Sequence, residues 1–92
     1  MAIDPNYEYA LNNMGWALNS LCNYNGAIQY SDKALTLDPK DSIALNNIGW
    51  ALTKLGNYTG AITYLDRALA IDPNYKLALN NKAWALKQLH HS

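Results

Sequence analysis

The stretch ALNNMGWALNSLCNYNGAI at residues 10–28 returns as ALNNIGWALTKLGNYTGAI at residues 44–62, and its first part returns again as ALNNKAWAL at residues 78–86. Each copy lies 34 residues after the one before, and the dipeptide Asp-Pro keeps the same step at Asp4-Pro5, Asp38-Pro39 and Asp72-Pro73. Sequence similarity at a fixed period of about 20 to 50 residues marks a repeat architecture. The chain therefore contains two full units and the first half of a third.

Each unit contains two helical patterns. The spacing i, i+3, i+4, i+7 and i+10 places one apolar stripe on a first helix, at Leu11, Met14, Gly15, Leu18 and Leu21. A second stripe begins at Ala27. We expect an all-α fold of antiparallel helix pairs, with five helices near 7–21, 25–37, 42–55, 59–71 and 75–90. They form a single domain, residues 1–92, with repeats at about 6–39 and 40–73 and a terminal capping helix at about 75–90.

The breaks between these helices contain residues that end or begin helices. Gly56 suits a left-handed helix end, whereas Cys22, at the same place in the first unit, does not. Asn25 and Thr59 are polar residues that can cap the helix that follows. The Asp-Pro pairs close each unit, since proline does not continue a helix.

Two glycines predict close contact between the helices of a unit. Gly15 and Gly49 remove side chains opposite Ala27 and Ala61, which offer only a methyl group. A glycine inside a helix costs about 1 kcal/mol relative to alanine, so packing has to offset that cost. In the third unit Lys82 replaces an apolar residue, and we expect it to solvate the open end of the stack, with chance drift as the alternative.

Composition and charge exclude several classes of function. The chain has 92 residues, seven Lys and Arg against seven Asp and Glu, and an isoelectric point near 6.7. This balance lacks the basic surface that nucleic acids and anionic membranes require, so neither is an expected partner. The small size, with no catalytic set and no metal-ligand pattern, predicts no enzyme activity, no cofactor and no metal. The single cysteine, Cys22, fits a reducing compartment, and we expect a cytoplasmic location.

These units resemble the tetratricopeptide repeat. The family's aromatic-x2-Leu-Gly-x2-Tyr signature is present as Leu11-x2-Met14-Gly15-x2-Leu18 and Leu45-x2-Ile48-Gly49-x2-Leu52, and the family's proline position holds Pro39 and Pro73. Leucine replaces the aromatic residue and the tyrosine, and Ser31 stands where a large side chain is usual. The resemblance implies a right-handed superhelical α-solenoid whose first helices line a concave groove, and a role in binding a protein or peptide partner.

Helix geometry identifies the face that would line this groove. At about 100° per residue, Asn12, Asn13 and Trp16 share the side of the first helix opposite its leucine stripe. Equivalent positions follow in the other first helices. The predicted groove residues are Tyr9, Asn12, Asn13, Trp16, Ile43, Asn46, Asn47, Trp50, Leu77, Asn80, Asn81 and Trp84.

The six asparagines of this face allow more than one interpretation. A side-chain amide carries an acceptor and two donors, which match a peptide backbone, so a column of asparagines can hold an extended chain. The column resembles the asparagine ladder of the family member that attaches N-acetylglucosamine to intracellular proteins, whose ladder corresponds to Asn13, Asn47 and Asn81. Alternatively the amides bond adjacent helices and fix the register of the repeats, or they repeat without selection.

A different binding mode of the family, the carboxylate clamp that grips the C-terminal tails of heat-shock chaperones, is not expected. It needs Lys and Asn where this chain has Asn12 and Trp16, Asn at Asn47, and Lys and Arg where it has Leu77 and Asn81. Only Asn47 matches. Without the cations, the charge-assisted hydrogen bonds to a terminal carboxylate are missing.

The tryptophans are either exposed anchors of a binding site or side chains packed between neighbouring first helices, and we expect partial burial. Three rungs of hydrogen bonds, at about 0.5–1.5 kcal/mol each, fall short of the roughly 8 kcal/mol of micromolar affinity. Binding by this chain alone should therefore be weak.

Three functions remain open. The first is a module that binds an extended peptide in the Asn- and Trp-lined groove. The second is a structural unit that self-associates through the terminal helix, where Leu79, Leu86 and Leu89 are only partly covered. The third is an engineered or excised repeat fragment with no evolved ligand.

Overall fold

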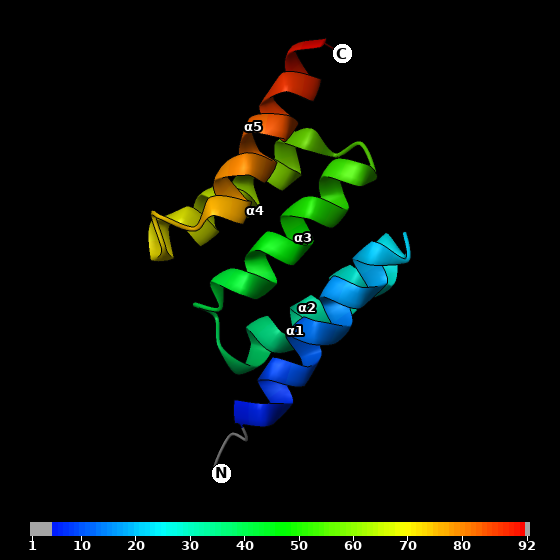
Figure 1. Cartoon of the computed structure of the whole chain (residues 1–92), viewed down its shortest axis with the longest axis vertical. Coiled ribbons are helices and arrows are strands. Elements are labelled where there is room, and N and C mark those ends of the chain that lie inside the picture. Colours follow the sequence, from blue (N-terminus) through cyan, green and yellow to red (C-terminus); the bar gives the residue numbers. More distant parts are fainter. Residues whose placement is uncertain (1–4, 92) are drawn as a thin grey trace.

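The computed structural model describes residues 5–91, and the helices in this range form two consecutive pairs followed by a single helix (Figure 1). Their bounds are α1 Pro5–Ser20, α2 Tyr24–Leu37, α3 Ser42–Lys54, α4 Tyr58–Ile71 and α5 Lys76–His91. The predicted bounds are confirmed to within two residues. The described residues contain helices and turns but no strand, as expected for an all-α fold. None of these helices is long and apolar enough to cross a membrane.

The pairs stack into an elongated body two helices thick. The chain measures 47 × 27 × 17 Å, and the shortest of these dimensions fits two layers of helices about 10 Å wide. The first helices, α1, α3 and α5, form one layer, and α2 and α4 form the other (Figure 1). In this arrangement α3 contacts all four other helices, so it is the most enclosed element.

The core consists of two apolar clusters that join neighbouring helices. One contains Leu11, Ala34 and Ala44, and the other contains Leu45, Leu65, Ala68 and Ala78. The alanines allow helix backbones to approach closely, while the leucines fill the remaining space. The clusters tie α2 to α3 and α4 to α5, and these contacts hold consecutive repeats together.

Asn23 and Asn57 cap α2 and α4. The side-chain oxygen of each accepts a hydrogen bond from the backbone N–H of the glycine three residues later, at 3.1 Å in the first unit and 3.0 Å in the second. The prediction that Asn25 and Thr59 are the caps is wrong, because both lie within the first turn of their helices. The turns before α2 and α4 are short, so each helix begins before the polar residue that was expected to cap it.

These tight turns depend on one left-handed residue each. Gly56 has φ 87°, as predicted, and Cys22 has φ 64° although its side chain disfavours this conformation. The backbone N–H of Asn23 then reaches the carbonyl of Leu18 at 2.8 Å, and the same bond in the second unit is 2.9 Å. Both turns are therefore Schellman motifs, and the motif imposes the same backbone on a cysteine as on a glycine.

The helices of each pair approach closely at the predicted glycines. A Cβ added to Gly49 would lie 2.6 Å from the side chain of Leu65, and a Cβ added to Gly15 would lie 2.6 Å from the Oγ of Ser31. The predicted close contact between the helices is confirmed, but the side chain nearest to each glycine is not the predicted alanine. The alanines expected to face these glycines are fully buried, whereas the nearest side chain belongs to the residue one helical turn later.

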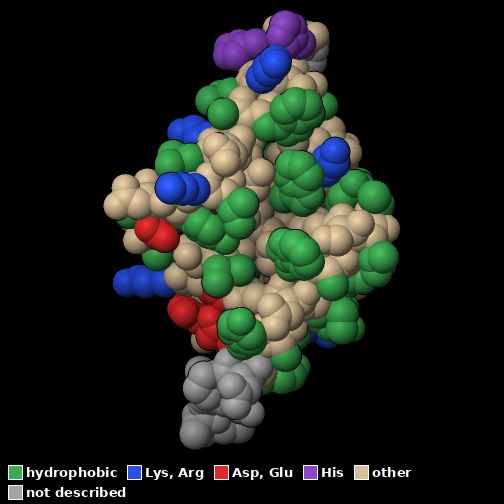
Figure 2. Space-filling view, viewed as in Figure 1, with side chains coloured by type: hydrophobic (Ala, Val, Ile, Leu, Met, Phe, Trp, Pro, Cys, Tyr) green, Lys and Arg blue, Asp and Glu red, His purple; other side chains and the backbone are tan. Residues whose placement is uncertain are grey.

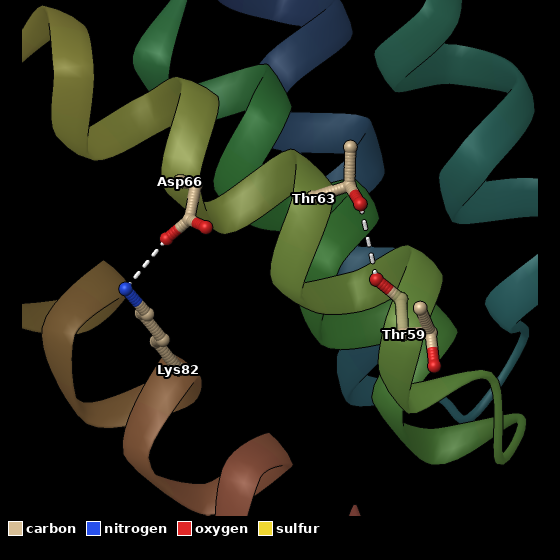
Figure 3. Close-up of polar contacts among 4 residues, drawn as sticks. All are labelled: Thr59, Thr63, Asp66 and Lys82. Atoms are coloured by element: carbon tan, nitrogen blue, oxygen red, sulfur yellow. Dashed lines mark hydrogen bonds and ion pairs between the residues drawn. The ribbon is translucent and has the colours of Figure 1, made fainter.

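The sequence predicted that Lys82 solvates the open end of the stack, and this prediction is wrong. Its Nζ lies 2.7 Å from Oδ1 of Asp66, so the side chain reaches back from α5 to α4 (Figure 3). On the same surface of α4, the hydroxyl of Thr63 donates to the carbonyl of Thr59 at 3.1 Å. The position of Lys82 faces the preceding helix, so the lysine forms an ion pair within the structure.

Candidate peptide-binding groove

A hollow of about 520 Å³ opens on the layer formed by α1, α3 and α5. Its lining comes from these three helices, from the turn after α1 and from the first residue of α2. The lining residues are Trp16, Asn19, Ser20, Cys22, Tyr24, Asn46, Asn47, Trp50, Lys54, Leu77 and Asn81. Hydrophobic side chains are spread over the face on which these first helices lie (Figure 2). Lys54 supplies the only full charge expected at neutral pH among these lining residues, which include no carboxylate.

Half of the predicted groove residues line this hollow. The six that do are Trp16, Asn46, Asn47, Trp50, Leu77 and Asn81. The six that do not are Tyr9, Asn12, Asn13, Ile43, Asn80 and Trp84. All of the latter are exposed except Asn12, which is buried. The hollow thus contains predicted residues from all three first helices, and the predicted residues that lie outside it also come from all three.

The buried asparagines bond to neighbouring helices. The side-chain amide of Asn47, which is 3% exposed, donates to the backbone carbonyl of Asn12 at 3.2 Å and ties α3 to α1. The amide of Asn81 donates to the side-chain oxygen of Asn46 at 2.9 Å and ties α5 to α3. These bonds correspond to the interpretation in which asparagines fix the register of the repeats. Of the three ladder positions, only Asn13 is exposed.

A polar cluster lies where α1 meets the start of α3. The amide of Asn12 donates to Asp41 at 2.7 Å, and the other carboxylate oxygen of Asp41 accepts from the backbone N–H of Ala44 and caps α3. The hydrogen bond between Glu8 and Asp41, together with burial and the charges of Asp41 and Asp38, raises the pKa of Glu8 to about 7. The junction of the two repeats therefore contains a carboxyl group that titrates near neutral pH.

The tryptophans differ in exposure along the stack. Trp50 is partly buried, and the Nζ of Lys54 lies 5.1 Å from its ring centroid in a cation–π contact. Trp16 is 63% exposed and Trp84 is 44% exposed, so the expectation of partial burial is right for the central tryptophan only. The reason is that α3 has a first helix on both sides, whereas α1 and α5 each have one.

Five lining residues were not predicted: Asn19, Ser20, Cys22, Tyr24 and Lys54. Asn19 lies three residues after Trp16, and Lys54 four residues after Trp50, so helical spacing places both on the tryptophan side. Extending the predicted face by one turn would have found them. The turn residues had no such signal, because their positions depend on the left-handed conformation of Cys22.

The amide of Asn19 adds a further bond between first helices. It is 7% exposed and donates to the backbone carbonyl of Asn47 at 3.0 Å. Its side-chain oxygen is buried, without a hydrogen-bond partner in the described part of the chain. Asn19 and Asn47 thus bond α1 and α3 in both directions, and these bonds hold the two helices together at the wall of the hollow.

Comparisons with known proteins agree with this architecture. Two models of the tetratricopeptide repeat match adjacent segments of the sequence, one over residues 8–41 and the other over residues 42–75. The chain belongs to the tetratricopeptide repeat family. Among solved structures, the Arabidopsis OM64 TPR domain is similar, with a TM-score of 0.81 and 28% sequence identity. The similarity covers 87% of this chain and 66% of that one. No curated protein sequence matches the chain at a significant level.

The family to which the chain belongs has a general function. Tetratricopeptide repeats are protein–protein interaction modules, and this chain has the helical hairpins and the α-solenoid arrangement of the family. Among the described residues, no three His, Cys, Asp or Glu side chains come together in a way that could hold a metal ion.

Proposed function

We propose that the hollow between α1, α3 and α5 binds an extended peptide segment of a protein partner. The observation that carries this proposal is the hollow itself, whose volume of about 520 Å³ falls within the usual range of about 300–1,000 Å³ for ligand sites. Two tryptophans and Leu77 stand at its wall. Aromatic side chains in such positions are the commonest anchors of protein interfaces.

The structure changes the roles that we assign within this groove. Asn46, Asn47 and Asn81 already bond to neighbouring helices, so part of their hydrogen-bonding capacity is used within the fold. Trp16 and Leu77, at 63% and 53% exposed, present apolar surface that remains in water. The tryptophans and the leucine therefore bind side chains of the peptide, and the asparagines hold the wall in shape.

The expected affinity is low. Burying an exposed side chain of this size contributes about 1.5–3 kcal/mol, and the hollow offers few such side chains. Association itself costs several kcal/mol. We therefore expect dissociation constants well above micromolar for this chain alone.

A peptide-library screen tests the proposal. The wild-type chain is used to select peptides, and the affinities of these peptides are then measured by fluorescence for Trp16→Ala, Trp50→Ala and Trp84→Ala. Trp84 is a matched control, because it occupies the same repeat position but lies outside the hollow. We expect about tenfold weaker binding for the first two variants and a change of less than about twofold for the third.

Two results would contradict the proposal. One is a screen that captures no peptide even at millimolar concentration. The other is an equal loss of affinity in all three variants, which would mean that the peptide follows the exposed tryptophans of the whole face and not the hollow.

A further inference from the structure

The hollow between α1, α3 and α5 carries one charge without a counter-charge. Lys54 is the only lining residue that is fully charged at neutral pH, and the lining contains no carboxylate. Among the described residues the ion pair is that of Lys82 with Asp66, which joins α5 to α4, and Lys54 takes part in none. An unpaired cation in a binding site favours a ligand that brings the opposite charge.

Trp50 holds this cation at the wall of the hollow. The Nζ of Lys54 lies 5.1 Å from the centroid of the Trp50 ring, so the charge and the apolar wall are neighbours. Lys54 is nevertheless exposed and can be reached by a ligand. A lysine that already rests on an aromatic ring has lost part of its side-chain freedom, so a further ion pair costs it less entropy.

The repeat itself does not require a lysine at this position. The equivalent positions in α1 and α5 hold Ser20 and Gln88. The hydroxyl of Ser20 donates to the carbonyl of Trp16 in its own helix at 3.1 Å. Three equivalent helices thus hold three different side chains here, and only the central one brings a cation to the hollow. The charge of Lys54 is therefore a property of the hollow and not of the repeat.

Other donors of the wall are engaged within the fold. The amides of Asn19, Asn47 and Asn81 each donate to a neighbouring helix. The C-terminal carboxylate of a peptide is held best by several charge-assisted hydrogen bonds at once, and the hollow offers one cation. A single lysine suits the side-chain carboxylate of an Asp or Glu inside a peptide, because one ion pair is enough for it.

We propose that the peptide bound in the hollow carries an Asp or Glu two residues away from a large apolar residue. This inference rests on the proposed function and adds the kind of sequence that the hollow selects. In an extended segment, residues i and i+2 point to the same side and lie about 7 Å apart. This spacing lets the carboxylate pair with Lys54 while the apolar side chain packs against Trp50, since these two groups are adjacent.

The ion pair determines the choice of peptide more than the strength of binding. A pair at an exposed site contributes a factor of about two to five in affinity, and salt weakens it. The effect of the acid should therefore be largest at low ionic strength. Lys33 provides a matched control, because its Nζ lies 5.0 Å from the centroid of the Tyr30 ring on α2 and it does not line the hollow.

A peptide selected by the wild-type chain tests the proposal. Its affinity is compared with that of the same peptide carrying Gln or Asn in place of the acid, for the wild type, Lys54→Gln and Lys33→Gln. At about 20 mM salt, the amide peptide should bind the wild type and Lys33→Gln about two- to fivefold more weakly than the acidic peptide does. Lys54→Gln should bind both peptides equally.

Reversing the charge completes the test. Lys54→Glu should prefer a peptide in which lysine replaces the acid, because the ion pair is then formed with its charges exchanged. Both lysines are exposed, so these variants should fold, as circular dichroism and urea unfolding check.

Several outcomes would overturn the proposal. The selected peptides could require Trp16 and Trp50 yet show no excess of acidic residues, which would leave the peptide-binding function standing. The amide peptide could lose affinity equally for the wild type and Lys54→Gln. The loss could instead follow amidation of the C-terminus of the peptide, which would assign Lys54 to a terminal carboxylate. Capture of no peptide at all would remove the peptide-binding function itself, and this inference with it.

Discussion

Asn13 and Asn47 occupy the same position in consecutive repeats, but only one of them has a neighbouring helix to bond. Asn47 is buried and donates to the carbonyl of Asn12, whereas Asn13 is exposed. A single asparagine can therefore be a surface residue in one copy and part of the packing in another. The difference comes from the place of the repeat in the stack and not from the residue.

This pair gives a matched test of the role of the asparagines. Asn47→Ala should lower the free energy of unfolding by about 1–2 kcal/mol, because a buried hydrogen bond is lost. Asn13→Ala should change it by less than about 0.5 kcal/mol, as is usual for exposed positions. Urea unfolding of both variants measures these values. If Asn47→Ala kept full stability and lost peptide capture, the amide would serve the ligand and not the stack.

At the scale of the helix, the end of α1 shows a conflict between side chain and backbone. Cys22 and Gly56 adopt the same left-handed conformation in equivalent Schellman motifs. A residue with a Cβ is strained there, and the strain is about 1–2 kcal/mol. The hydrogen bonds of the Schellman motif impose the turn, so the cysteine adopts the same backbone conformation as the glycine.

The two turns allow a reciprocal exchange. Cys22→Gly should stabilise the chain by up to about 1 kcal/mol, since relief of strain outweighs the added freedom of the unfolded glycine. Gly56→Cys should destabilise it by a similar amount, and no atom lies within 4 Å of an added Cβ to obscure the effect. Equal stability of the wild type and both variants in urea would show that the turns carry no strain.

The helices could be predicted from the sequence, whereas their caps could not. The apolar period of each unit determined the helix bounds to within two residues, because every unit repeats the same stripe. The caps were misplaced because Asn23 and Asn25 are both suitable residues, and only the turn geometry selects the first. For the same reason, helix geometry placed Trp16 and Asn12 on one face but did not show that α3 covers only Asn12.

At the scale of the whole molecule, the junction between repeats makes the free energy of unfolding depend on pH. The pKa of Glu8 rises from 4.5 to about 7 beside Asp41. Between these two values the folded chain retains a proton that the unfolded chain has lost. The free energy of unfolding that Glu8 contributes is therefore present below pH 4.5 and lost as the pH rises through 7.

Glu8→Gln should remove the contribution of this residue to the pH dependence of stability, because glutamine does not titrate. The variant and the wild type should have similar urea midpoints at pH 4.5, and the variant should be the more stable of the two at pH 8. Measurements at half-unit steps between these limits follow the difference. A constant difference across the whole range would show that Glu8 titrates normally and that its contact with Asp41 does not affect stability.

Cys22 has one more consequence. It is the single cysteine of the chain, it is exposed, and it stands at the wall of the hollow. A thiol-reactive dye would attach there and nowhere else, at a place where an arriving peptide changes the surroundings of the fluorophore. Because the label leaves the rest of the protein unaltered, its fluorescence can report directly whether a peptide occupies the hollow.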